Sequence, residues 1–303
     1  GEAAMTALAT GTSENSTSDV GSGMKITKLK EHIGAEVTGI DLRDDIDAET
    51  HQRLNDALVE HVALVVRDQH FEPADFQRAI ERFGEIMPDN NSLHVVDGFP
   101  MMLVLSNRLK DSKGGPAKVE KNSNWHTDHT NHECPPKFTT LYALELPDSG
   151  AITSVANMKA AYKALPAEWK DRLDGLSTFN TLISRANWET GNPDIVKEQK
   201  ESTKPPVEHP LVRTNPESGE KAVWFHKGKT DTVTGMDPYE TQDFLGELLA
   251  ISMKDEFIYA HEWQLGDLLM VDNRSTMHRA GVDYDHTQHR LLHRLMVRGE
   301  RPI

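Results

Sequence analysis

Three side chains that could bind one metal ion are spread over about half of the sequence. His126 and Asp128 form a His-x-Asp pair, and His278 lies far downstream within a polar segment. In an extended strand, residues i and i+2 project from the same face, so His126 and Asp128 can face one ion. If a second strand supplies His278, the chain has to fold so that strands remote in the sequence become neighbours.

Two kinds of metal site compete in this segment. Two imidazoles and one carboxylate leave positions open on a metal, and non-haem Fe(II) oxygenases use this arrangement to bind a co-substrate and O₂. Alternatively, His126, His129 and His132 are spaced three apart and would share a helical face that could hold zinc. The residues around them disfavour a helix: Thr127, Thr130, Asn131 and Pro135. We therefore favour the extended arrangement and expect His129 and His132 on the pocket wall or the surface.

The neighbours of the His-x-Asp pair also suit a metal centre. Trp125 and Tyr142 would supply apolar surroundings, while Asn122, Asn124 and Thr127 would orient the ligands by hydrogen bonds.

The segments expected to surround the site are less regular. Residues 107–124 have little periodicity and run into the motif, so they form either a mobile substrate lid or a solvated loop without a role. Pocket walls are expected from residues 88–124 and from Trp224-Phe225-His226, which read equally well as loop and core.

Short apolar segments separated by turns predict a β-rich fold. Strands are expected at residues 36–41, 62–66, 138–146, 207–214, 222–225, 256–263, 268–271 and 291–297. Helices are expected at residues 47–61, 72–84 and 157–173, the last interrupted at Pro166, and from Asp237 onward. Many strands with helices outside them indicate an α+β domain around a β-sandwich or jelly roll, whose mouth suits a metal.

Composition restricts the expected partners and location. The chain has 33 Lys+Arg against 48 Asp+Glu, a net charge of −15, which argues against nucleic-acid binding. No apolar run approaches the length needed to cross a bilayer, so no membrane partner is expected. The single cysteine, Cys134, excludes an intrachain disulfide and fits a cytoplasmic location. The small, polar residues 1–23 are expected to be a disordered leader before a single domain over residues 24–303.

Two arginines near the C-terminus suggest anion binding. Arg290 and Arg294 are four residues apart, so on a strand they share one face with Leu292. Buried guanidiniums are costly without anionic partners, and arginine binds carboxylates through two hydrogen bonds. A dicarboxylate co-substrate and an acidic substrate would neutralise both, although either arginine alone could be a solvent-facing edge charge.

Three motifs occur together in this sequence: Asn124-Trp125-His126-Thr127-Asp128, His209-Pro210-Leu211-Val212-Arg213-Thr214 and Asp272-Asn273-Arg274-Ser275-Thr276-Met277-His278-Arg279. With the opening segment 34–42, they resemble the taurine dioxygenase and chlorophenoxyacetate dioxygenase family of Fe(II)- and 2-oxoglutarate-dependent enzymes. The resemblance covers roughly residue 24 to the C-terminus. It implies a double-stranded β-helix, which is a jelly-roll core with flanking helices, and relatives that often form dimers or tetramers.

The resemblance also implies roles for individual residues. The iron ligands would be His126, Asp128 and His278. The distal carboxylate of 2-oxoglutarate would be bound by Thr153 and Arg290. The substrate would contact Asn122 and, through its acidic group, Arg294.

Two departures from the family pattern affect these expectations. Gly150-Ala151-Ile152-Thr153 stands where the family usually has Gly-Gly-Asp-Thr, which restricts the backbone and removes a polar partner. Val271 replaces a Trp that is common before Asp-Asn-Arg, opening space or altering packing near the metal. Asp128 is present, whereas related halogenases have a small residue there, so hydroxylation is favoured.

The expected reaction is hydroxylation of a small organic anion, with 2-oxoglutarate and O₂ consumed and succinate and CO₂ released. The anion could be a sulfonate, a sulfate ester, or an aryloxy- or aminocarboxylate, and the adjacent C–S, C–O or C–N bond could then break. Two alternatives stay open at this point: a zinc-dependent hydrolase and a non-catalytic metal-binding jelly roll. Arg290 favours the oxygenase, because a hydrolase needs no second anion-binding group.

Overall fold

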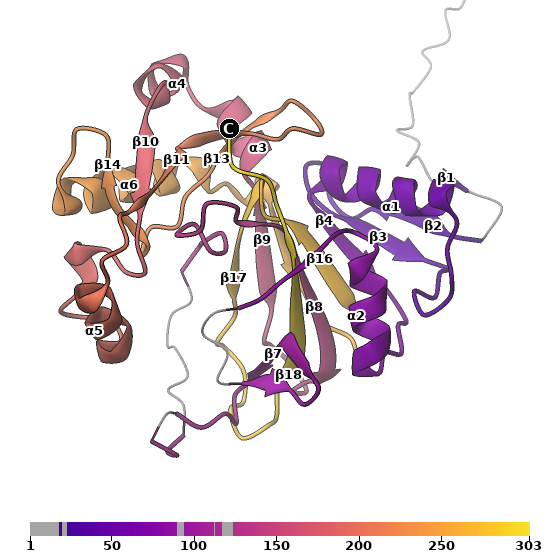
Figure 1. Cartoon of the computed structure of the whole chain (residues 1–303). Coiled ribbons are helices and arrows are strands. Elements are labelled where there is room, and N and C mark those ends of the chain that lie inside the picture. The colour runs from indigo at the N-terminus through magenta and orange to yellow at the C-terminus, as the bar shows by residue number, and fades with distance from the viewer. Residues whose placement is uncertain (1–17, 20–22, 90–93, 112, 117–123) are drawn as a thin grey trace, which may run out of the picture.

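The computed structural model describes residues 18–19, 23–89, 94–111, 113–116 and 124–303 (Figure 1). Its largest element is a ten-stranded sheet in the order β1-β2-β3-β4-β16-β8-β18-β7-β6, with β5 paired to β18. In that order the strands are Ser18–Asp19, Lys25–Lys28, Ala35–Thr38, Ala63–Val66, Leu268–Asp272, Pro136–Glu145, Leu291–Arg298, Phe99–Ser106 and Val95–Val96, and β5 is Ile86–Met87. All of these pairs are antiparallel except β3 with β4.

Three smaller sheets complete the strand structure. The sheet β15-β9-β17 consists of Ile258–His261, Thr153–Asn157 and Thr276–Ala280. The sheet β11-β10-β14 consists of Val207–Pro210, Ser177–Asn180 and Thr230–Val233, and β12 (Val212–Thr214) pairs with β13 (Lys221–Val223). Val155 of β9 packs with Val65 and Leu269 of the large sheet. The two sheets therefore face each other across a common core, as the α+β jelly-roll expectation requires, and that expectation is confirmed.

The central strands alternate between two apolar environments, because successive side chains of a strand point to opposite faces. On β16, Leu268 and Met270 pack on the helix-covered side, whereas Leu269 and Val271 pack between the sheets. The same alternation on β18 places Leu295 on the helix-covered side. Arg294, the preceding residue, therefore points into the space between the sheets.

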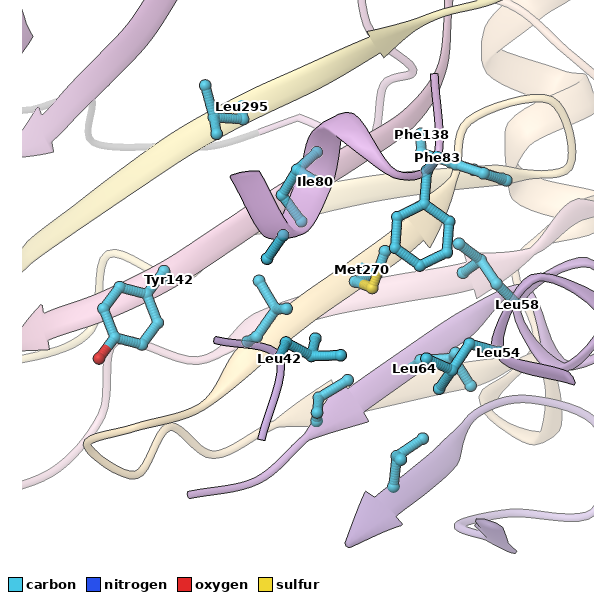
Figure 2. Packing of buried hydrophobic residues seen from close by; sticks show 14 of the residues in the cluster. Leu42, Leu54, Leu58, Leu64, Ile80, Phe83, Phe138, Tyr142, Met270 and Leu295 are labelled. Carbon is cyan, nitrogen blue, oxygen red and sulfur yellow. The ribbon is translucent and has the colours of Figure 1, made fainter. Parts of the chain in front are cut away.

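Two helices cover the outer face of the large sheet (Figure 1). Helix α1 (Ala48–His61) begins after Asp47, whose side chain accepts a hydrogen bond from the Thr50 amide, and α2 (Pro73–Glu81) begins with Pro73. Figure 2 shows Leu58 of α1 and Ile80 of α2 in the apolar cluster over this face. Both helices were expected from the sequence: α1 ends at His61 as predicted, whereas α2 ends at Glu81, three residues before the expected end at Gly84.

The remaining helices lie in the second half of the chain. They are α3 (Met158–Ala164), α4 (Ala167–Leu173), α5 (Pro193–Glu201) and α6 (Pro238–Ser252), with short 3-10 turns at Arg185–Asn187 and Asp255–Phe257. Pro166 separates α3 from α4 as predicted, because proline cannot donate the backbone hydrogen bond that a continuous helix needs. None of the helices in the described part of the chain is long and apolar enough to span a membrane.

Several sequence expectations need correction. The segment 207–214 is not one strand, since β11 pairs with β10 and β12 pairs with β13. Ser18–Asp19 pairs with β2, although it falls within the leader expected to be disordered; residues 1–17 and 20–22 lie outside the described residues.

Tyr142 does not border the metal motif. It packs on the helix-covered side against Phe71 and Phe76.

The turn between β16 and β17 is fixed by a buried ion pair. Arg274 Nε lies 2.9 Å from Asp272 Oδ1, and Arg274 also pairs with Glu217 at 2.6 Å. Asn273, between them, accepts a hydrogen bond of 2.7 Å from the Trp224 indole. These contacts set the start of β17 and therefore the position of His278.

Replacing Arg274 by Ala is expected to lower the free energy of unfolding by about 3–5 kcal/mol, because Asp272 would stay buried without its charged partner. Urea unfolding measures this change. The matched control is Arg298→Ala, whose pair with Glu85 is solvent-exposed and should cost about 1 kcal/mol or less. Equal losses in the two variants would contradict a structural role for the buried pair.

Candidate metal centre

His126, Asp128 and His278 converge in the space between the two sheets. Their ligand atoms all lie within 4.8 Å of one another. Asp128 Oδ1 lies 3.6 Å from His126 Nε2 and 3.5 Å from His278 Nε2. Within the residues that the structure describes, this is the one group of three His, Cys, Asp or Glu side chains that could hold a metal ion.

Backbone pairing brings the two remote histidines together. The His126 amide donates to the His278 carbonyl at 3.1 Å, and the His278 amide donates to the His126 carbonyl at 2.8 Å. This is an isolated antiparallel bridge at the edge of β17 rather than a longer strand through the His-x-Asp pair. The chain then turns at His129, which has a left-handed backbone with φ of 51°.

The helical arrangement that would have united His126, His129 and His132 does not form. Residues 124–135 contain no helix. The His129 and His132 rings contact each other with centroids 5.2 Å apart, and neither belongs to the three-residue metal group.

Hydrogen bonds hold the ligand side chains in place. His126 Nδ1 lies 2.8 Å from the Asn124 carbonyl, so it can carry the ring proton and leave Nε2 to bind a metal. The Thr139 hydroxyl donates to Asp128 Oδ2 at 2.6 Å. Thr127, expected to orient the ligands, instead donates to the Asn273 carbonyl at 3.0 Å and ties the motif to the β16–β17 turn.

The charge states of Asp128 and His278 suit a divalent cation, whereas the Asp128 carboxylate raises the pKa of His126 against the effect of burial, so a metal would displace a proton from His126. Burial opposes ionisation of Asp128, but His278, His126 and Arg294 stabilise its negative charge and hold the pKa of Asp128 well below its usual range. Burial lowers the pKa of His278 to about 4. An ionised carboxylate and a neutral imidazole are the forms that bind metals. Two imidazole nitrogens and one carboxylate oxygen also fit Fe(II) by ligand type.

Arg290 and Thr153 come together on one side of this cluster. Arg290 Nη2 lies 3.5 Å from the Thr153 hydroxyl, which also accepts a hydrogen bond of 3.0 Å from the Trp263 indole. Burial lowers the pKa of Arg290, and its Nε atom has no hydrogen-bond partner among the described residues. A buried guanidinium with an unused donor favours binding of an anion, because the anion neutralises the charge and accepts the hydrogen bond.

Arg294 lies on the same side of β18 but has a protein partner. Its Nη2 atom lies 2.5 Å from Asp89 Oδ2, and His129 Nε2 lies 3.8 Å from the same oxygen. Asp89 and His129 line a cavity of about 920 Å³, together with His132, Asn180 and Lys229, and none of the three candidate ligands lines it.

The two departures from the family pattern have different outcomes. Ala151 adopts φ of 56°, a left-handed conformation that glycine would adopt without strain, and Gly150 before it has φ of 80°. The missing glycine therefore leaves an alanine in a backbone conformation that favours glycine, just before Thr153. Val271 is 4% exposed and packs with Ile33 between the sheets, so its environment is close-packed.

Some expected wall residues reach the site and others do not. The His226 ring lies 5.3 Å from that of His126, whereas Trp224 and Phe225 are fully buried in the core. Asn122 lies outside the described residues, as do 90–93, 112 and the rest of 117–123. Asp89 falls within the wall segment 88–124 that was expected, although it was not singled out there. Thr139 and Trp263 were missed in the sequence; the expected strand at 138–146 is the signal that could have placed Thr139 on the inner face.

Comparisons with known proteins agree with this geometry. A family model described as "Taurine catabolism dioxygenase TauD, TfdA family" matches residues 25–296. The chain is 32% identical to an alkylsulfatase of Acinetobacter baylyi, over 91% of this chain and 86% of that protein. It is 31% identical to an alpha-ketoglutarate-dependent sulfate ester dioxygenase of Pseudomonas putida, over 89% and 88%. The crystal structure of AAD-2 with Mn(II) and N-oxalylglycine is similar with a TM-score of 0.75 and 29% identity, over 92% of this chain and 98% of that one.

Proposed function

The chain belongs to the taurine catabolism dioxygenase TauD, TfdA family, and on this premise we propose that His126, Asp128 and His278 are its iron ligands. The protein is a 2-oxoglutarate-dependent dioxygenase that uses Fe(II) and O₂. The observation that carries the ligand assignment is the convergence of these three side chains within 4.8 Å from two distant parts of the chain. The family match favours this function over the zinc hydrolase and the non-catalytic binder.

Bound iron supplies the oxidative chemistry, in which O₂ converts 2-oxoglutarate to succinate and CO₂ and hydroxylates a C–H bond. The chain itself binds and orients. Asp128 stays ionised at neutral pH, and Thr139 fixes the oxygen of Asp128 that does not face the histidines. His126 and His278 are fixed to each other by two backbone hydrogen bonds, which would orient these two side chains toward one metal ion.

Arg290 and Thr153 would bind the distal carboxylate of 2-oxoglutarate. The unused donor of Arg290 supports this role, since a carboxylate would satisfy it and neutralise the buried charge. Trp263 would act as a positioning residue, because its indole hydrogen bond holds the Thr153 hydroxyl beside Arg290. Asn122 remains a proposed substrate contact that rests on the resemblance alone.

The substrate is proposed to be a small organic anion. Arg294 points from β18 toward the ligands, and its charge contributes to the low pKa of Asp128, so an acidic group held there would lie near the metal. Relatives named for sulfate esters, alkyl sulfates and aryloxy acids support this class. The location in the cytoplasm, the single-domain organisation and a dimeric or tetrameric state remain predictions.

A screen of alkyl sulfates, alkanesulfonates, aryloxyacetates and amino acids tests the proposed function. Each compound is added to the protein with Fe(II) and 2-oxoglutarate, and O₂ uptake and succinate are recorded. At least one class should raise both above the substrate-free background, with one succinate formed per hydroxylated product. If 2-oxoglutarate is never consumed, while Zn(II) supports hydrolysis of one of the esters, the hydrolase is correct.

A further inference from the structure

The guanidinium proposed to receive the substrate's acidic group is already paired with a carboxylate of the protein. Asp89 follows β5, which pairs with β18 at Met296, and this pairing brings Asp89 beside Arg294. The distance of 2.5 Å between Arg294 Nη2 and Asp89 Oδ2 indicates a charge-assisted hydrogen bond. Both side chains are largely buried, with 17% and 8% of their surface exposed.

This pairing changes what a substrate meets at Arg294. An entering anion finds a neutral ion pair instead of an isolated positive charge, and it lies close to the negative charge of Asp89. Water screens this repulsion weakly, because both side chains are largely buried. A simple monoanion is therefore bound less well than Arg294 alone would allow.

The Arg294 guanidinium still has one hydrogen-bond donor that the described residues do not use. Arg294 Nε is buried and has no hydrogen-bond partner among the described residues. An acidic group of the substrate can accept from this donor while Asp89 stays beside the guanidinium. If the substrate also carries an ammonium group, that group can donate to Asp89, and the four charges alternate in sign.

We propose that Asp89 is a specificity-determining residue that favours acids bearing an ammonium group over simple monoanions. The inference rests on the proposed function, since it assumes that the substrate's acidic group binds at Arg294. It goes further by selecting one substrate class, the zwitterionic acids, from the small organic anions. Asp89 also lines a cavity of about 920 Å³, so a face of this residue is open to a small molecule.

Two probes that differ only in the ammonium group test the proposal: propane-1-sulfonate and 3-aminopropane-1-sulfonate. Their affinities are measured by isothermal titration calorimetry under nitrogen, with Fe(II) and 2-oxoglutarate bound, so that no turnover occurs. The wild type should bind the amino compound about tenfold or more tightly. Asp89→Asn should bind propane-1-sulfonate more tightly than the wild type does and lose the preference for the amino compound.

The control variant is Glu198→Gln, which removes one negative charge from the wall of the same cavity without touching Arg294. It should keep the wild-type preference within about twofold. An unchanged preference in Asp89→Asn would overturn the proposal, and so would equal binding of the two probes by the wild type. Binding of neither probe to either protein would overturn it as well.

Asp89→Asn leaves Arg294 without its carboxylate and is expected to be less stable than the wild type, so a second variant accompanies it. The double variant Asp89→Asn/Arg294→Gln removes both charges, and it should melt at a higher temperature than Asp89→Asn and show no preference between the probes. Repeating the titrations on metal-free protein separates this inference from the proposed function. Failure to bind Fe(II) and 2-oxoglutarate refutes the function, whereas the probe preference of metal-free protein still reports on Asp89.

Discussion

His126→Ala is expected to abolish substrate-dependent succinate formation, with a loss of roughly 1,000-fold or more, because one of three metal ligands is removed. The remaining pair, Asp128 and His278, still lies 3.5 Å apart but offers only two ligand atoms. Succinate is quantified after incubation with Fe(II), 2-oxoglutarate and the best substrate of the screen. Anaerobic titration of Fe(II) into the variant provides a second readout, and binding should be much weaker than in the wild type.

The matched control is His70→Ala, which removes an exposed histidine whose only ion pair in the described structure is with the surface residue Asp68. This variant should keep the wild-type rate and iron affinity. The His126 backbone also forms two hydrogen bonds to His278 of β17, and alanine can form the same bonds, so the fold should be retained. Circular dichroism of both variants checks this. Wild-type succinate formation by His126→Ala would remove this residue from the ligand set.

Arg290→Gln should raise the KM for 2-oxoglutarate by about 100-fold or more, because buried charge-assisted hydrogen bonds to the distal carboxylate are lost. The effect should fall mainly on KM, since the distal carboxylate is held equally before and during the reaction. A co-substrate without that carboxylate, 2-oxobutanoate, gives a sharper test. The wild type should prefer 2-oxoglutarate strongly, and the variant should lose most of this preference.

Arg78→Gln serves as the control for Arg290, because Arg78 is an exposed arginine on α2 whose carboxylate partner, Asp75, lies on the same helix. Its kinetic constants should match the wild type. If Arg290→Gln keeps its preference for 2-oxoglutarate over 2-oxobutanoate within twofold, the distal carboxylate binds elsewhere.

The local parts of this fold could be predicted because short-range rules determine them. Asp47 caps α1, Pro73 starts α2, and the alternating environments of residues 63–66 follow from an apolar run buried on both faces. Strand β9 was not predicted, and a strand around His278 was expected without its bounds, since Thr153–Asn157 and Thr276–Ala280 contain small and polar residues without a clear period. They form strands because they pair with each other. This pairing joins distant parts of the chain, so no short stretch of sequence predicts it.

The same distinction applies to the site. The convergence of His126, Asp128 and His278 could be predicted because a His-x-Asp pair and a distant His match a known ligand pattern, and the shared side of the arginines because of their spacing. Asp89 could not, because its role depends on the pairing of β5 with β18 across some two hundred residues of sequence. Its pairing with Arg294 is a property of the tertiary structure alone.

The central claim is that one iron ion binds where His126, Asp128 and His278 meet. Crystals grown without oxygen in the presence of Fe(II) and 2-oxoglutarate, with diffraction recorded on both sides of the iron absorption edge, test it most directly. The account predicts a single strong anomalous peak bonded to His126 Nε2, Asp128 and His278 Nε2. A peak at His129 and His132, or no ordered iron at the three side chains, would contradict it.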